Sequence, residues 1–226
     1  VISTIMKPVE KIMTGLPGYI VVVLIMQLLW WFGIHGSNVM SAVTTPFMTK
    51  MMATNLELYQ SGEGVTSAGV FYSAGSQYNI ISGPFGAGWF SPTGSGITMG
   101  LIIAVMLFSK RDDFKAIAKL AIPCGIFNIN EPIIFGIPMV MNAMFAVPFF
   151  LAPIACVCCG YLVQSLGLCP LFIIDVPWTT PVGLFGFLAS SGNIMGAIWQ
   201  AVIILGVSTL IYTPFVIAAN RQEAEA

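Results

Sequence analysis

The sequence predicts an all-α, polytopic membrane protein that combines transmembrane helices with two re-entrant helical hairpins. Of the 226 residues, 57% are hydrophobic and only 8% are charged. Soluble domains have about 25% charged residues, so this chain carries too few charges to cover a surface that faces water. Several apolar runs have the length of a membrane-spanning helix. Others are short and broken by glycine and proline, which is typical of segments that enter a membrane and turn back.

Composition also excludes several classes of function. The net charge is −1 and the sequence has no basic patch, so we expect no binding of nucleic acid. The five cysteines lie in apolar surroundings, and no pair has the spacing of a zinc site. They are Cys124, Cys156, Cys158, Cys159 and Cys169. We therefore expect no metal and no cofactor, and we interpret these cysteines as small apolar residues within helices.

Four segments are predicted to span the membrane because they are apolar and free of charge. They are Pro17–Ile34, Gly94–Phe108, Met144–Leu168 and Gly192–Ala219. Residues 1–16 form a short amphipathic segment, either a linker at the membrane surface or the frayed end of a helix. Residues 53–67 form the longest polar stretch and are predicted to be a loop in solvent.

Two further apolar segments are predicted to be re-entrant arms. Val39–Met52 would be only about 21 Å long as a helix, which is too short to span comfortably. It belongs to the arm Gly36–Met52, and the second arm is Cys169–Ser191. Each arm contains a Thr-Thr-Pro break, and interrupted segments in corresponding places favour a transport site.

The remaining stretches indicate orientation and packing. Residues 109–119 carry four positive and two negative charges, which favours the cytoplasmic side, with docking of a partner protein as the alternative. Residues 68–96 are rich in glycine, serine and aromatic residues. Small residues favour close packing of helices, and stacking of a bound solute on one of the aromatic rings is the alternative.

An isolated carboxylate lies in the apolar second half of the chain. Glu131 is the only formal charge between Lys119 and Asp175. Such a group costs about 2.5–3.5 kcal/mol at a membrane centre. Asn128 and Asn130 flank it, and nearby prolines and glycines interrupt any helix. Free backbone groups beside a buried charge are typical of a site for a polar solute.

Other residues could complete a site for a polar solute. Amides, carboxylates and imidazole bond hydroxyl groups, whereas aromatic rings cover the apolar faces of a bound molecule. His35, the only histidine, lies between glycines just beyond an apolar span and can exchange a proton near neutral pH. Trp30 and Trp178 each lie close to a predicted arm, with anchoring at the membrane interface as the alternative. Asp175 is either a second carboxylate of the site or the cap of a short helix.

The run N-I-N-E-P-I-I-F-G-I-P-M-V-M-N, residues 128–142, resembles the signature of the enzyme IIC permeases of the bacterial sugar phosphotransferase system. It is most similar to the lactose, cellobiose and diacetylchitobiose family. The resemblance extends over residues 1–226 and covers the C-terminal, substrate-binding half of the membrane domain. It implies that the N-terminal half is absent, and the start at Val1 is that expected of an excised fragment.

This resemblance implies a function. Such a permease binds a β-linked disaccharide of the cellobiose or diacetylchitobiose class, translocates it and presents it to the phospho-cysteine of enzyme IIB. The G-I-H-G motif maps the family's sugar-contacting histidine onto His35. Glu131 and His35 would hold the reacting hydroxyl, and which of them is the base stays open. None of the five cysteines matches the phosphorylated cysteine of enzyme IIB. Whether the chain itself is an enzyme therefore also stays open.

The resemblance further implies a homodimer that crosses the bacterial plasma membrane several times, in contact with lipid. Two alternatives remain. The chain could be a secondary transporter that couples sugar to protons through Glu131, or a structural half that binds no sugar alone. Uptake driven by a proton gradient without enzyme IIB would favour the first of these alternatives.

Overall fold

The structure is a computed structural model that describes residues 13–67 and 69–224. Most of the predicted amphipathic segment 1–16 lies outside these residues. The described part is mainly helical, with one short β-hairpin. The helices are α2 (Leu16–Trp31), α3 (Gly36–Gln60), α4 (Gly83–Trp89), α5 (Met99–Phe108), α6 (Asp112–Ile126), α7 (Glu131–Gly136), α8 (Ala143–Ser165), α9 (Leu184–Ala189), α10 (Ile194–Ala201), the π-helical η1 (Val202–Val207) and α11 (Ser208–Ala224). Strands β1 (Val65–Thr66) and β2 (Gly69–Val70) pair antiparallel.

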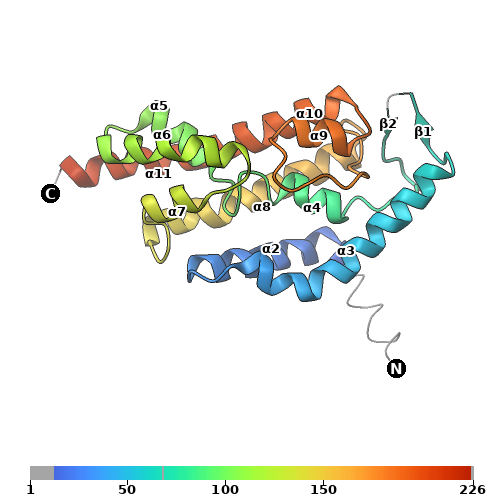
Figure 1. Cartoon of the computed structure of the whole chain (residues 1–226), viewed down its shortest axis with the longest axis horizontal. Coiled ribbons are helices and arrows are strands. Elements are labelled where there is room, and N and C mark those ends of the chain that lie inside the picture. Colours follow the sequence, from blue (N-terminus) through green and yellow to red (C-terminus); the bar gives the residue numbers. More distant parts are fainter. Residues whose placement is uncertain (1–12, 68, 225–226) are drawn as a thin grey trace.

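The helices run along the long axis of an elongated molecule (Figure 1). Helix α8 packs on α2 and α11, and α11 also packs on α5. Helix α3 returns along α2 after a tight turn, and α6 returns along α5. The C-terminus and the α5–α6 connection lie at one end, whereas the β-hairpin lies at the other (Figure 1).

Two of the helices are long and apolar enough to cross a membrane. They are Ala143–Ser165, with 23 residues, and Ile194–Arg221, with 28 residues, which continues through α10, η1 and α11. Helices α2 and α5 are apolar but shorter. The predicted span from Gly94 is wrong at its start, because the helix begins only at Met99. Residues 93, 94, 96 and 97 all have positive φ angles, which a right-handed helix cannot accommodate.

The predicted arm Gly36–Met52 forms the first part of α3, which runs on to Gln60. The predicted solvent loop 53–67 is therefore wrong for residues 53–60. The helix continues because its buried face continues with Asn55. The Asn55 amide donates to the carbonyl of Asn79 and accepts from its N–H, both at 2.8 Å. A buried amide satisfied in this way stabilises a packed helix where composition alone indicates solvent.

The predicted arm Cys169–Ser191 is mostly irregular and contains only α9 as a helix. Its connection to the following helix depends on Gln200 of α10. The Gln200 Oε1 accepts hydrogen bonds from the N–H groups of Gly183 and Gly186, at 2.9 and 2.8 Å. These bonds satisfy the start of α9 and hold it against α10, so the segment returns toward the helices rather than continuing outward.

The apolar core contains a stack of aromatic rings around Trp89. The rings of Trp89 and Phe172 are nearly parallel, with centroids 5.1 Å apart, and Phe185 meets Phe172 edge-on. Helix α8 lies against the indole at Gly160, where a Cβ atom would overlap the Trp89 ring. Close packing of this kind leaves no room for an added methyl group.

We predict that Gly160→Ala lowers the free energy of unfolding by about 1–3 kcal/mol, because the new methyl group overpacks the core against Trp89. The matched control is Gly206→Ala, also in a helix, where nothing lies within 4 Å of the added atom. The control should be neutral or stabilise by up to about 1 kcal/mol. Thermal unfolding in detergent measures both, and equal midpoints would contradict the packing described here.

Candidate functional site

Five of the predicted site residues line one pocket of about 410 Å³. It lies where α2 ends, α3 begins, and the 90–95 loop, the α6–α7 turn and the 169–183 segment meet. The lining residues are Trp30, His35, Ser37, Asn38, Phe90, Ser91, Gly94, Ser95, Asn128, Asn130 and Trp178. The pocket thus joins residues from both predicted arms with the two asparagines of the signature run.

His35 is placed by the turn between α2 and α3. It is the N-cap of α3, and its Nδ1 accepts a hydrogen bond from the N–H of Asn38 at 3.3 Å. The next residue must be glycine, because a Cβ at Gly36 would overlap the carbonyl of Met26. The imidazole also packs on Trp30, with ring centroids 4.5 Å apart. Since Nδ1 accepts this bond, Nε2 is the ring nitrogen left to donate to a ligand.

Asn128 ties two loops together. Its φ of 66° places it in the left-handed region, which asparagine tolerates better than most residues. Its Oδ1 accepts from the N–H of Thr93 at 2.6 Å, and its Nδ2 donates to the carbonyls of Trp178 and Thr180. The amide therefore joins both the 90–95 loop and the Trp178 segment to the α6–α7 turn.

Asn130 supports the same wall two residues later. It is buried, and its Nδ2 donates to the carbonyl of Ser95 at 2.6 Å. Its side chain occupies the space that a Cβ at Gly94 would need. The two asparagines thus shape the pocket through their bonds to backbone carbonyls. Direct contact of either amide with a substrate stays a prediction.

The two tryptophans differ in what they offer to a ligand. Trp178 is 61% exposed, so it presents an open ring at the pocket. Trp30 is only 6% exposed and packs on His35. Its indole nitrogen has no hydrogen-bond partner within the described residues. Trp178 is therefore the better placed ring for stacking, whereas Trp30 supports the imidazole.

The two predicted carboxylates lie outside this pocket. Glu131 directly follows Asn130 and begins α7, where it is exposed and does not line the pocket. Asp175 is also exposed and lines a different pocket of about 460 Å³, together with Tyr59 and Ser191. The structure therefore joins neither carboxylate directly to His35, and their assignment to the site stays a prediction.

The loop after α4 adds Phe90, Ser91 and Ser95 to the pocket lining. They belong to the stretch predicted to pack helices, with stacking of a ligand on one of its aromatic rings as the alternative, and the two serines were not singled out. The signal lies in the run S-P-T-G-S-G at 91–96, because small polar turn residues after an aromatic form a loop rather than a helix. Across residues 13–67 and 69–224, no three His, Cys, Asp or Glu side chains are grouped to hold a metal.

Comparison with known proteins gives consistent matches. The family model for the phosphotransferase system EIIC matches residues 2–153. The chain is 35% identical over 234 residues to the cellobiose-specific EIIC component of Lactococcus lactis, covering 97% of this chain and 46% of that protein. It is 35% identical over 225 residues to the lichenan permease IIC component of Bacillus subtilis, covering 99% and 47%.

A solved structure shares the fold. The crystal structure of the transporter ChbC, the IIC component from the N,N'-diacetylchitobiose-specific phosphotransferase system, superposes with a TM-score of 0.85 at 31% identity. The match covers 96% of this chain and 48% of that one, so the chain spans about half the length of these relatives. The resemblance read from residues 128–142 and the helical membrane fold are thereby confirmed. The chain belongs to the EIIC family of the phosphotransferase system.

Proposed function

We propose that the chain is the C-terminal, substrate-binding half of a sugar permease that crosses the bacterial plasma membrane several times. It binds a β-linked disaccharide of the cellobiose or diacetylchitobiose class and presents it to enzyme IIB. The observation that carries this proposal is the pocket that joins His35, Trp178 and the two signature asparagines. The names of the relatives, which include cellobiose, oligo-β-mannoside and diacetylchitobiose systems, support this class of sugar.

The pocket suits a sugar in size and chemistry. Its volume of about 410 Å³ lies within the range of about 300–1,000 Å³ that small-molecule sites occupy. The exposed Trp178 ring can cover one apolar face of a pyranose. Ser37, Asn38 and Ser91 bring polar groups for the hydroxyls. A ligand held between a ring face and polar groups is oriented as well as bound.

His35 acts as a hydrogen-bond donor to the sugar. Its Nδ1 is occupied as the N-cap acceptor of α3, so Nε2 is the ring atom left for a substrate. A charged imidazolium would lose this cap and would place a positive charge at a helix N-terminus, where the helix dipole opposes it. The neutral donor therefore fits the geometry better than a base that takes up a proton.

Glu131 takes the proton of the reacting hydroxyl. Its carboxylate is exposed next to Asn130, a wall residue of the pocket. In the transfer, the hydroxyl oxygen attacks the phosphorus of phospho-cysteine on enzyme IIB. The P–S bond breaks, the cysteine leaves as a thiolate, and the proton passes to Glu131. Such transfers depend chiefly on positioning and charge stabilisation.

The finer architecture follows from the same pocket. We infer that the α2–α3 turn and the 169–191 segment are re-entrant arms, since His35 on one and Trp178 on the other line one cavity. The intact permease lies in a lipid bilayer and is a homodimer, as the resemblance implies. Asp175 lines a separate pocket, so its role as a second carboxylate of the sugar site stays a prediction.

We predict that His35→Asn weakens sugar binding about 3- to 10-fold and lowers phosphorylation at least as much, because asparagine lacks the Nε2 donor and one hydrogen bond contributes about 0.5–1.5 kcal/mol. The asparagine still caps α3, so thermal stability should be close to that of the wild type. His35→Ala also loses the cap and should be less stable by about 1 kcal/mol. Binding by calorimetry and phosphorylation with enzyme IIB measure this, and normal activity of either variant would refute the assignment of His35.

We predict that Glu131→Gln lowers phosphorylation of the sugar about 100-fold or more, because the amide accepts no proton. Disaccharide affinity should stay within a few-fold of the wild type. Vesicle uptake with phosphoenolpyruvate and the soluble components measures the first quantity, and calorimetry the second. Full phosphorylation by the variant would rule out Glu131 as the base. Uptake driven by a proton gradient alone would favour the proton-coupled alternative.

We predict that Trp178→Ala weakens disaccharide binding about tenfold, because an exposed ring contributes roughly 0.5–1.5 kcal/mol through stacking beyond the area it buries. Trp178→Phe retains a ring face and should recover most of the affinity. Calorimetry measures the disaccharide affinity of both variants. Equal affinity of the alanine and wild-type proteins would place the sugar elsewhere.

A further inference from the structure

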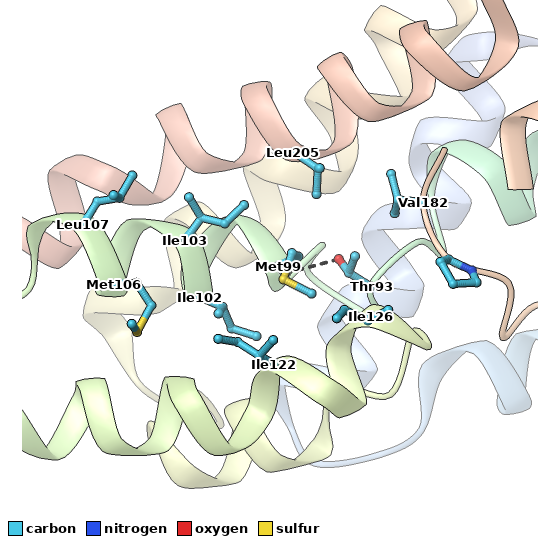
Figure 2. A pocket seen from close by; sticks show the side chains of 11 residues that line it. Thr93, Met99, Ile102, Ile103, Met106, Leu107, Ile122, Ile126, Val182 and Leu205 are labelled. Carbon is cyan, nitrogen blue, oxygen red and sulfur yellow. Dashed lines mark hydrogen bonds between the residues drawn. The ribbon is translucent and has the colours of Figure 1, made fainter. Parts of the chain in front are cut away.

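A second cavity of about 410 Å³ forms an apolar groove along α5 and α6. Figure 2 shows Ile102 and Met106 of α5 beside Ile122 of α6, with Val182 and Leu205 near its inner part. Its one polar side chain is Thr93, which is buried and already accepts a hydrogen bond from the N–H of Met99. A cavity lined in this way offers nothing to a polar solute and suits hydrocarbon.

The groove is distinct from the sugar pocket, and a shared wall separates the two cavities. Thr93 and Pro181 line the groove. The Asn128 amide, which lines the other pocket, bonds the N–H of Thr93 and the carbonyl of Thr180. The two cavities therefore present different chemistry on opposite sides of this bonded wall.

Three lysines lie at the end of the groove that is nearest the α5–α6 connection. On α6, Lys115, Lys119, Ile122 and Ile126 are spaced by four, three and four residues, which places them on one helix face. Ile122 and Ile126 line the groove, so this helix face carries apolar lining residues at one end and the two lysine ammonium groups at the other. Lys110 follows the α5 lining residue Leu107 by three positions and is exposed.

The positive charge at this end is not cancelled by neighbouring carboxylates. Arg111 pairs with Asp113 at 2.6 Å, and this hydrogen bond lowers the pKa of the Asp113 carboxyl. Among the side chains that the structure describes, up to Arg221, no carboxylate is in ion-pair distance of Lys110, Lys115 or Lys119. Asp112 adds one negative charge nearby, so an excess of positive charge remains at the mouth of the groove.

We propose that this groove holds an acyl chain of an anionic phospholipid, whose headgroup phosphate is bound by Lys110, Lys115 and Lys119. The stretch of α5 that lines it, Met99–Leu107, is about 12 Å long at 1.5 Å per residue. One leaflet contributes half of a hydrocarbon core of about 30 Å, so the groove matches the depth of one leaflet. Lysines near a membrane surface attract anionic headgroups, and the apolar walls select the tail.

The test uses the intact protein in nanodiscs of phosphatidylglycerol or phosphatidylcholine with the same acyl chains, followed by native mass spectrometry. We expect a retained phosphatidylglycerol and little retained phosphatidylcholine. The groove-filling variant Ile126→Trp should lose the retained lipid. Its control, Leu120→Trp, lies on the same helix at a 75% exposed residue that does not line the groove and should keep it.

The headgroup is tested separately by the double variant Lys115→Gln, Lys119→Gln. We expect its apparent affinity for phosphatidylglycerol to fall about tenfold or more, with no change for phosphatidylcholine. These substitutions lie on the outer part of α6 and leave the apolar core intact. Lys50→Gln, on α3 outside the groove, is the control and should bind as the wild type does.

Two results would overturn the proposal. One is equal retention of the two lipids that the lysine variant does not change, which indicates unspecific lipid around the helices. The other is undiminished retention in a folded Ile126→Trp protein, which places the lipid elsewhere. If Ile126→Trp fails to fold, the lysine variant decides alone. Sugar binding enters none of these readouts, so failure of the sugar assignment leaves this test unaffected.

Discussion

The hydrogen bonds of the Asn128 side chain are the constraint on which the site depends. This one amide bonds Thr93, Trp178 and Thr180, which lie 35, 50 and 52 residues away. Each bond contributes about 0.5–1.5 kcal/mol, and a buried partner left unsatisfied costs about 1–3 kcal/mol. Because three irregular segments meet here, and irregular backbone survives at membrane depth only when buried or lining a cavity, the amide maintains both the wall and the pocket.

The sequence predicts those parts of the site that depend on local chemistry. His35 is predicted just beyond an apolar span and Trp178 close to a re-entrant arm, and both line the pocket. The network of Asn128 is not predictable, because its partners are backbone groups far along the chain. Glu131 illustrates the opposite case: its isolation in the sequence is evident, but the N-terminal turn of α7 directs it outside the pocket lining.

The fold shows a similar division between local and long-range causes. The apolar runs at 144–168 and 192–219 predict the two long helices, because length and composition suffice. The start of α5 and the end of α3 are missed for different reasons. Positive φ angles at residues 93, 94, 96 and 97 delay α5. The glycines at 94 and 96 signal such a turn, whereas Thr93 and Ile97 do not. Asn55 extends α3 through a bond to Asn79, a partner that periodicity cannot reveal.

The proposed function places the disaccharide between His35 and Trp178. A structure of the intact permease with bound disaccharide tests this placement most directly. The expected result is a pyranose ring stacked on Trp178, with a hydroxyl within about 3.2 Å of His35 Nε2, the reach of an ordinary hydrogen bond. A sugar bound only in the pocket beside Asp175 and Tyr59, with the His35 pocket empty, would contradict it.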